Sequence, residues 1–476
     1  MTEAPSPAPQ KGLGVGAILA FAGPSLPLAG MGTIYGVYMA PYLTGVLGVG
    51  LTAIAGAFLI IQALTLFLDP VLGWAMDRTK TPIGRFRPWL LASTPIFLLA
   101  VYMMFMAKPG IGARYLIVWG LVMGLGTSML TLSQAAWGAN LASTYNERSK
   151  LYGIIGGIGG VGAILFLAMQ VIFAKPHPGL PNNIQISGWV VLVLVPITIA
   201  ILAVVVREPV SPTTKTPFKL GDYWEMIWRP EMRRLILADF ALALGPGTTG
   251  PLYLFFFRDA LGFTAAQEGF LLMIYVAAAF FGGPVLGWVA TRLNKHRTLM
   301  LSTVGYAICQ TSLFVIPKGM FIAAVPGMLG CGFIAAGFTL LVRAMIADVG
   351  DEVRLEQGKE RMSLLYSLVT TTTKVGGAIT VPVTYSILAA VGYKTAATAV
   401  NTPAAIHGLV MCYVFAPVFF VLVGGAVMFG YKLDAKRHAE VREQLDLRDA
   451  AAGGALVLDE LNRSEILEAA ATPEPG

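Results

Sequence analysis

Two ionisable residues lie deep within apolar stretches of the sequence, where a charge is costly and usually has a function or a partner. Asp69 lies in the run LTLFLDPVLGW, roughly 12 Å before the next acid, Asp77, at the 1.5 Å rise of an α-helix. Pro70 follows Asp69 and lacks a backbone donor, which leaves carbonyl oxygens that a cation could use. We predict a proton or sodium site at Asp69, with a structural ion pair between helices as the alternative. Thr65, one turn away on the same face, joins this predicted site.

Lys374, in the run SLVTTTTKVGGAI, is the second deep charge. It lies too far from either end of its apolar stretch for the side chain to reach the membrane surface easily. Such a lysine needs an anionic partner, which is either a group of a bound solute or Asp69 when no cation is bound. We predict a role for Lys374 in substrate binding or coupling.

Uncharged polar residues supply the rest of the predicted cavity. The run GTSMLTLSQAAWGAN carries hydroxyl and amide groups, and the first apolar stretch carries tyrosines but no charge. A cavity with this lining favours a neutral or amphipathic solute. The candidate substrate residues are Thr131, Gln134, Tyr35 and Tyr38.

Charges also gather at the ends of apolar stretches, where they can form a network that holds one conformation closed. One group lies in DRTKTPIGRFRPW and a second follows residues 320–347. Near the ends of two later stretches, Asp239, Arg258, Asp259 and Glu268 predict exposed salt bridges. The predicted cytoplasmic gate consists of Asp77, Arg78, Arg85, Arg87, Asp348, Asp351 and Arg361.

The elements that must position these residues are membrane helices. Of the 476 residues, 56% are hydrophobic and 12% are charged, whereas about a quarter of the residues in soluble domains are charged. The apolar runs are long enough to cross a bilayer and lack the alternating pattern of barrel strands. The twelve predicted helices cover residues 15–42, 51–76, 88–107, 114–141, 151–174, 186–206, 234–257, 264–291, 298–317, 320–347, 361–391 and 405–431.

The formal net charge of +7 arises from lysine and arginine residues that gather in alternate short loops. Membrane orientation explains this pattern, because cytoplasmic loops are enriched in these residues, and we expect no nucleic-acid partner. The asymmetry predicts a multi-pass protein of a bacterial-type inner membrane, with both termini in the cytoplasm.

No arrangement of residues in the sequence indicates a metal site or catalysis. Cys309, Cys331 and Cys412 lie in apolar stretches and lack the spacing of a metal motif. No stretch presents a nucleophile beside a base. We therefore expect no enzyme activity, no metal, and no cofactor beyond H⁺ or Na⁺ as a coupling ion.

An internal repeat divides the chain. The segments PVLGWAMDRT at 70–79 and PVLGWVATRL at 284–293 begin with the same five residues and carry an arginine at the same distance. They indicate two six-helix halves, as in carriers that hold a solute between the halves near the membrane midplane. The predicted parts are a disordered arm at 1–12, halves at 13–206 and 234–432, a cytoplasmic loop at 207–233 and a cytoplasmic tail at 433–476.

Several of these motifs resemble the glycoside-pentoside-hexuronide:cation symporters of the major facilitator superfamily, typified by melibiose permease. The resemblance implies twelve helices in two halves related by a pseudo-twofold axis, and cation-coupled uptake. It places Asp69 in the cation site, Ser128 where a cation-site hydroxyl is expected, and Lys374 close by. The matching residues are Asp69-Pro70-Val-Leu-Gly73, Asp77-Arg78-Thr79, Gly84-Arg85-Phe-Arg87-Pro88-Trp89, Ala347-Asp348-Val-Gly-Asp351, Gly358-Lys359, Tyr366-Ser367 and Lys374-Val-Gly-Gly377.

The chain also departs from the sugar carriers of that family. Where those carriers have a second acid one turn before the Asp-Pro pair, this chain has Thr65. Their further acids and arginine align with Ala29 or a neighbour, Thr131 and Gly156. A single carboxylate makes a proton at least as suitable as sodium, and the missing charges weaken the case for a galactoside.

The sequence therefore predicts an all-α secondary active transporter that couples the movement of a small solute to a H⁺ or Na⁺ gradient by alternating access. The solute is a sugar or glycoside, or a more amphipathic molecule. A lysolipid or amphiphile carrier, a proton-coupled efflux pump and a transport-dead sensor that keeps the carrier fold remain alternatives. The expected partners are a small-molecule substrate and membrane lipid, and the expected state is a monomer.

Overall fold

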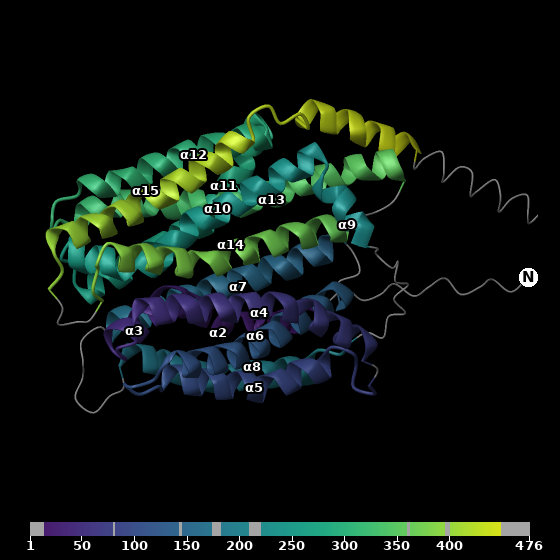
Figure 1. The fold of residues 1–476 in the computed structure, drawn as a ribbon. Helices are drawn as coiled ribbons and strands as arrows, with labels where there is room; N and C mark the ends of the chain where they lie inside the picture. Colours follow the sequence, from purple (N-terminus) through teal and green to yellow (C-terminus); the bar gives the residue numbers. More distant parts are fainter. Residues whose placement is uncertain are drawn as a thin grey trace, which may run out of the picture.

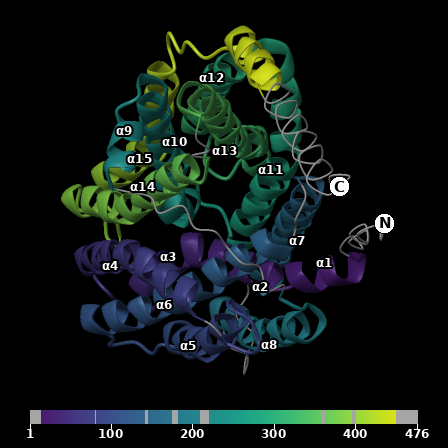
Figure 2. The ribbon, with the colours of Figure 1, turned by 90° about the vertical axis from the view of Figure 1, so that its right-hand side faces the viewer.

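The computed structural model of the chain describes residues 14–79, 81–141, 145–173, 182–208, 220–358, 362–395 and 400–448. Within these ranges every regular element is a helix. Figures 1 and 2 show two groups of helices, one above the other. The predicted arm at 1–12 and the tail beyond residue 448 lie outside the described residues, and the predicted domain boundaries stay predictions.

The lower group in Figure 1 is the N-terminal half. Its first membrane pass is divided into several pieces, because Pro24 separates two helices and a π-helical turn follows. The elements are α1 (Val15–Ala22), α2 (Ser25–Ile34), η1 (Tyr35–Met39), α3 (Ala40–Gly45), α4 (Leu51–Arg78), α5 (Arg87–Phe105), α6 (Ala113–Leu141), α7 (Tyr145–Ile172) and α8 (Asn183–Val205).

The upper group is the C-terminal half, and the short helix α9 precedes it. A further helical segment, residues 435–448, follows the last membrane pass. Figure 1 shows this segment and α9 at the same end of the bundle, which we call the α9 end. The elements are α9 (Leu220–Ile227), α10 (Pro230–Phe255), η2 (Phe256–Ala260), α11 (Ala265–Leu293), α12 (Lys295–Ser312), η3 (Leu313–Val315), α13 (Phe321–Gln357), α14 (Met362–Ala390) and α15 (Pro403–Val427).

The predicted all-α membrane fold is confirmed. In the described part of the chain, 11 helical spans are long and apolar enough to cross a membrane. The remaining long helix, α14, has 29 residues and completes two sets of six. It is less apolar than the others because it carries Lys374 and a run of threonines.

The two halves meet along two helix pairs, α4 with α14 and α7 with α11 (Figures 1 and 2). Away from the α9 end, one buried apolar core joins them further. It contains Tyr38 and Met39 from the N-terminal half together with Phe256 and Tyr385 from the C-terminal half. A second core belongs to the C-terminal half and α9. Buried apolar surface therefore holds the halves together at the end opposite α9.

Candidate functional site

An ion pair joins the two halves at the contact between α4 and α14. The Nζ of Lys374 donates a hydrogen bond to Oδ2 of Asp69. The Asp69 side chain is only 12% exposed, whereas that of Lys374 is 47% exposed. The second carboxylate oxygen, Oδ1, is buried and has no hydrogen-bond partner. The structure thus brings together the two deep charges of the sequence and leaves one acceptor of Asp69 available.

Both helices carry this pair without losing their regular form. Helix α4 continues through Pro70, whose missing N–H leaves the Leu66 carbonyl without its helical donor. On α14, the hydroxyl of Thr372 donates to the Leu368 carbonyl one turn earlier, so this β-branched polar residue fits within the helix.

Helix α4 contacts α6 at Thr65, one turn before Asp69. Thr65 packs over Gly124, where an added Cβ would lie 2.9 Å from the Thr65 hydroxyl oxygen. The Thr65 hydroxyl donates to the Ile61 carbonyl at 2.6 Å. The next turn of each helix places Ser128 at the level of Asp69, because the two helices run in the same direction (Figure 1). Ser128 is 7% exposed, whereas Thr65 and Asp69 are half-buried.

The four candidate substrate residues do not form one cluster. Gln134 is buried and donates to the Phe21 carbonyl at 3.0 Å, so its amide holds α6 against α1. Tyr35 stacks on Phe58 at 5.9 Å between ring centres, and the buried Tyr38 hydroxyl has no partner. Thr131 is exposed and its hydroxyl donates to Thr127 one turn earlier. Thr131 is therefore the most accessible of the four.

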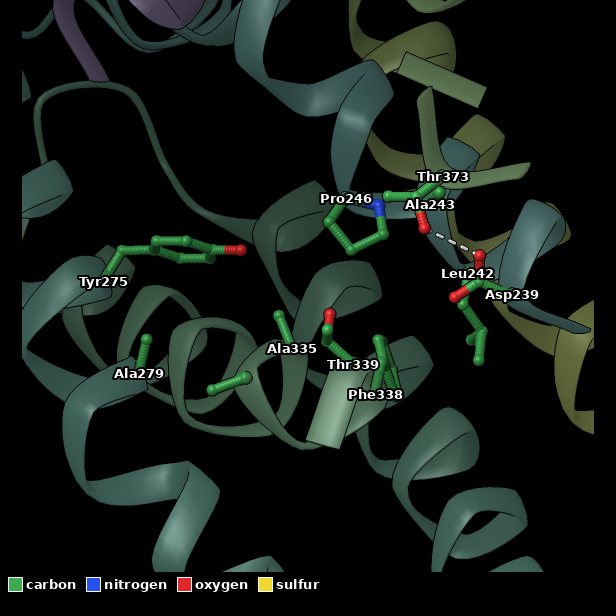
Figure 3. Close-up of a pocket in the computed structure, with 11 residues that line it drawn as sticks. Asp239, Leu242, Ala243, Pro246, Tyr275, Ala279, Ala335, Phe338, Thr339 and Thr373 are labelled. Carbon is green, nitrogen blue, oxygen red and sulfur yellow. Dashed lines mark hydrogen bonds between the residues drawn. The ribbon is translucent and has the colours of Figure 1, made fainter. Parts of the chain in front are cut away.

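A cavity of about 320 Å³ lies on the C-terminal half, between α10, α11, α13 and α14. Figure 3 shows Asp239 and Thr373 on one side of it, Tyr275 on the other, and Thr339 between them. Asp239 Oδ2 accepts a hydrogen bond of 2.8 Å from the Thr373 hydroxyl. Asp239 is 7% exposed, and it contributes an acid to the lining of the cavity.

The predicted exposed salt bridges are correct for Arg258 and Asp259, which pair at 2.7 Å. They are wrong for Asp239 and Glu268, because both side chains are buried and neither forms an ion pair among the described residues. Helix α10 begins at Pro230 and not at 234, so Asp239 lies deeper than its position in the predicted segment indicated.

At the α9 end, the loop between α4 and α5 is anchored by Glu208, which sequence reasoning missed. Its carboxylate accepts hydrogen bonds from the backbone N–H groups of Arg85 at 2.8 Å and Arg87 at 3.1 Å. An acid at the N-terminus of α5 also complements the helix dipole. Gly84 has φ +117°, and an added Cβ would lie 2.1 Å from Glu208 Oε2. The two residues are more than 120 positions apart, so no local pattern revealed the contact.

The acids of the predicted gate on α13 pair with the C-terminal half and the tail. Asp348 pairs with Lys295 at 2.6 Å, and Asp351 pairs with His438 of the 435–448 segment at 3.0 Å. Arg78 lies over the Trp74 ring at 4.0 Å. The side chain of Asp77 and all of Arg361 lie outside the described residues. The tail therefore supplies a partner for Asp351 that the sequence analysis did not predict.

Burial also shifts the pKa of Tyr431 at the α9 end. Tyr431, just after α15, is 6% exposed. Burial raises the pKa of Tyr431 above its ordinary value, and the Asp348 carboxylate acts in the same direction. Tyr431 is thus a neutral packing residue between α15 and the end of α13.

Among the described residues, no group of three or more His, Cys, Asp or Glu side chains could hold a metal ion. What the site offers is one interhalf ion pair with a spare carboxylate oxygen, one buried acid in a cavity, and charged groups at helix ends. Such an arrangement can bind a small cation or a hydrogen-bond donor and link it to the contact between the halves.

Known proteins share both the sequence pattern and the fold. The family described as MFS/sugar transport protein matches residues 20–435. The lactose permease of Lactobacillus delbrueckii subsp. bulgaricus is 25% identical over 80% of this chain, and the chain spans 63% of that permease. The sodium-dependent lysophosphatidylcholine symporter 1-A of Danio rerio is 23% identical, over 87% of this chain and 85% of the symporter.

The crystal structure of the nucleoside transporter NupG has a TM-score of 0.66 and 12% identity, over 87% of this chain and 100% of NupG. This likeness shows the major facilitator fold. The family match over most of the chain confirms the membership of the major facilitator superfamily that the motifs indicated. The chain is a multi-pass membrane transporter of small molecules and not an enzyme, and it belongs to the family of MFS/sugar transport proteins.

Proposed function

We propose that this protein couples the movement of a small solute to a H⁺ or Na⁺ gradient by alternating access, with Asp69 as the cation site. The observation that carries the proposal is the Asp69–Lys374 pair, because it links α4 of one half to α14 of the other. A cation that binds Asp69 competes with Lys374 for the carboxylate. Binding therefore weakens a contact between the halves, which is the event that a coupled carrier requires.

The chemistry of the site accommodates either ion. A proton needs only the carboxylate, and Oδ1 of Asp69 is available for it. A sodium ion needs several oxygen ligands, for which Thr65, Ser128 and the Leu66 carbonyl are the nearest candidates along α4 and α6. The single carboxylate favours the proton, because it leaves less negative charge for a metal ion.

The substrate class follows from relatives and from the cavity. The named relatives carry lactose and lysophosphatidylcholine, so a sugar or glycoside and a lysolipid are both within the range of the family. The cavity on the C-terminal half combines one acid with alanines, Leu242 and Phe338. This lining favours a solute with a polar and an apolar part. Proton-coupled efflux is the other candidate.

The proposal includes an orientation. The α9 end, with α9, the α4–α5 loop and the 435–448 segment, is placed in the cytoplasm of a bacterial-type inner membrane, because basic loops stay on that side. The halves pack together at the opposite end. The conformation described here is then one in which the outer side is closed, and the protein acts as a monomer.

The test uses the purified full chain in lipid nanodiscs. The thermal unfolding of the wild type and of Asp69→Asn is measured in NaCl and in choline chloride, each at two pH values. A ligand that binds the folded state raises the unfolding temperature, so the wild type should respond to Na⁺ or to pH and Asp69→Asn should respond to neither. An equal response of the variant would remove Asp69 from the cation site, and the ion that acts on the wild type identifies the coupling ion.

A further inference from the structure

The two halves offer a solute different acids. Asp69 of the N-terminal half is occupied by Lys374. Asp239 of the C-terminal half accepts one hydrogen bond from Thr373 and forms no ion pair in the described part of the chain. Arg343 interacts electrostatically with the Asp239 carboxylate, but the two side chains do not form an ion pair. Asp239 is therefore the acid that a solute in the cavity can reach.

An unpaired buried carboxylate is costly unless donors surround it. A carboxylate has room for about four hydrogen bonds, and among the described residues the protein supplies Asp239 with one, from Thr373. Figure 3 shows the carboxyl group at the side of the cavity, next to the Thr373 side chain. A ligand with donor groups would supply the remaining hydrogen bonds to the Asp239 carboxylate.

The rest of the lining constrains the body of such a ligand. Facing Asp239 across the cavity are Tyr275 and Ala279 of α11, with Ala335 and Phe338 of α13 below (Figure 3). A second cavity of about 150 Å³ shares Tyr275 and Pro246 with the first and is lined further by Tyr253, Tyr306 and Tyr413. The two cavities together form an acidic head region followed by an aromatic region.

We propose that Asp239, positioned by Thr373, binds the head group of the transported solute. The head group is a hydrogen-bond donor, either a sugar hydroxyl or a protonated amine, and the remainder of the solute is an apolar or aromatic body that lies against Tyr275. This inference rests on the proposed transport function and assigns the polar end of the substrate to the C-terminal half, while the cation site stays on the N-terminal half.

The experiment compares three probes that share an aromatic body: phenyl β-glucoside, phenethylamine and 3-phenylpropionate. Their affinities for the full chain in nanodiscs are measured by calorimetry, for the wild type, Asp239→Asn, Asp239→Ala and the control Glu443→Gln, which removes an exposed acid of the tail. The wild type and Glu443→Gln should bind the glucoside or the amine and reject the carboxylate.

The variants separate the two head groups. Amine binding depends on the charge, so Asp239→Asn should weaken it by about tenfold or more. Glucoside binding needs acceptors, which Asn keeps in part, so Asp239→Ala should weaken it more than Asp239→Asn does. Unchanged affinities in Asp239→Ala, preference for the carboxylate, or wild-type failure to bind either donor probe would each overturn the proposal.

The response to Na⁺ and pH keeps this test apart from that of the proposed function. Both Asp239 variants should retain the wild-type response, which also shows that they are folded. Loss of that response in Asp239→Asn would identify Asp239 as a cation site and overturn its assignment to the head group. Failure of the probes with an intact, Asp69-dependent response would leave cation coupling standing and remove only the substrate subsite.

Discussion

The residue just before each of the repeated segments in α4 and α11 differs in a way that matters for chemistry. Both helices carry the run PVLGW, but Asp69 precedes Pro70 in α4, whereas Gly283 precedes Pro284 in α11. The proline that disturbs the helix is thus present in both halves, and the acid only in one. A proline alone does not make an ion site, and the asymmetry assigns the proposed cation chemistry to the N-terminal half.

The two helices also differ in how closely they pack against their neighbours. Helix α11 packs backbone to backbone against α13. A Cβ added to Gly282 would lie 1.8 Å from the Phe333 carbonyl oxygen, and one added to Gly332 would lie 2.1 Å from that of Tyr275. Such close packing of small residues is typical of membrane helices, and at Gly282 and Gly332 it leaves no space for a side chain.

Helix α4 packs less closely against its equivalent neighbour, α6. There the glycine at 124 accommodates the Thr65 side chain and not a carbonyl group. One turn further, the same interface holds Asp69 on one helix and Ser128 on the other. The comparison teaches that the N-terminal half gives up close helix packing at the place where it holds polar groups.

The largest expected effect on this comparison comes from Lys374→Ala. Without the ammonium group, Asp69 has no competitor, so we expect its cation affinity to rise by up to about fivefold while cation-driven solute movement is lost. Titrating the unfolding temperature with Na⁺, and separately with pH, measures the affinity. Lys318→Ala, which removes an exposed lysine far from the pair, is the control. An unchanged affinity in Lys374→Ala would mean that the ion pair does not compete with the cation.

The next effect tests the packing of α11. Gly282→Ala should lower the free energy of unfolding by about 1–3 kcal/mol, because the new methyl group meets a backbone carbonyl that cannot move away alone. Gly283→Ala is a matched control, since a Cβ at the next position meets no atom within 4 Å. Both are measured by denaturant unfolding in nanodiscs or mild detergent. Equal stability of the two variants would contradict the close approach of α11 and α13.

The sequence was sufficient for the fold and for the two deep charges, since both depend on hydrophobicity that is visible along the chain. Asp69 and Lys374 stand out because isolated charges in apolar runs are rare. Their pairing was one of two partners considered for Lys374, and the structure brings them together. The functional roles assigned to them stay predictions.

Contacts between distant segments could not be predicted. In the sequence, Glu208 is an ordinary charged residue after a predicted helix. Only the fold brings it to the α4–α5 loop. The sequence predicts Gln134 as a cavity residue, but its amide donates to the Phe21 carbonyl near the end of α1. His438 pairs with Asp351 although the tail carries no recognisable motif. Each case depends on which helix faces which, and hydropathy does not specify that.

A smaller effect distinguishes the loops that follow the two repeats. Glu208→Gln keeps the shape of the side chain but weakens three charge-assisted hydrogen bonds to backbone N–H groups, so we expect a loss of about 1–2 kcal/mol. The equivalent connection after α11 is the single residue Asn294, with φ 74°, and contains no such anchor. Thermal unfolding of Glu208→Gln beside Glu443→Gln tests this. A variant as stable as the control would show that the loop is held by other contacts.

The smallest expected effect concerns what the repeats share. Arg78 lies 4.0 Å from the centre of the Trp74 ring, and Arg292 lies 5.5 Å from that of Trp288. Exposed cation–π contacts contribute about 0.5–1 kcal/mol and weaken with distance, so Arg78→Ala should cost more stability than Arg292→Ala. Differential scanning of both variants beside Trp74→Leu and Trp288→Leu measures the two contacts. If Arg292 contributes as much stability as Arg78, distance does not set the strength of the contact. The shared arginine would then serve helix ending and membrane orientation, which both halves need. It would have no part in the cation chemistry that we propose for α4 alone.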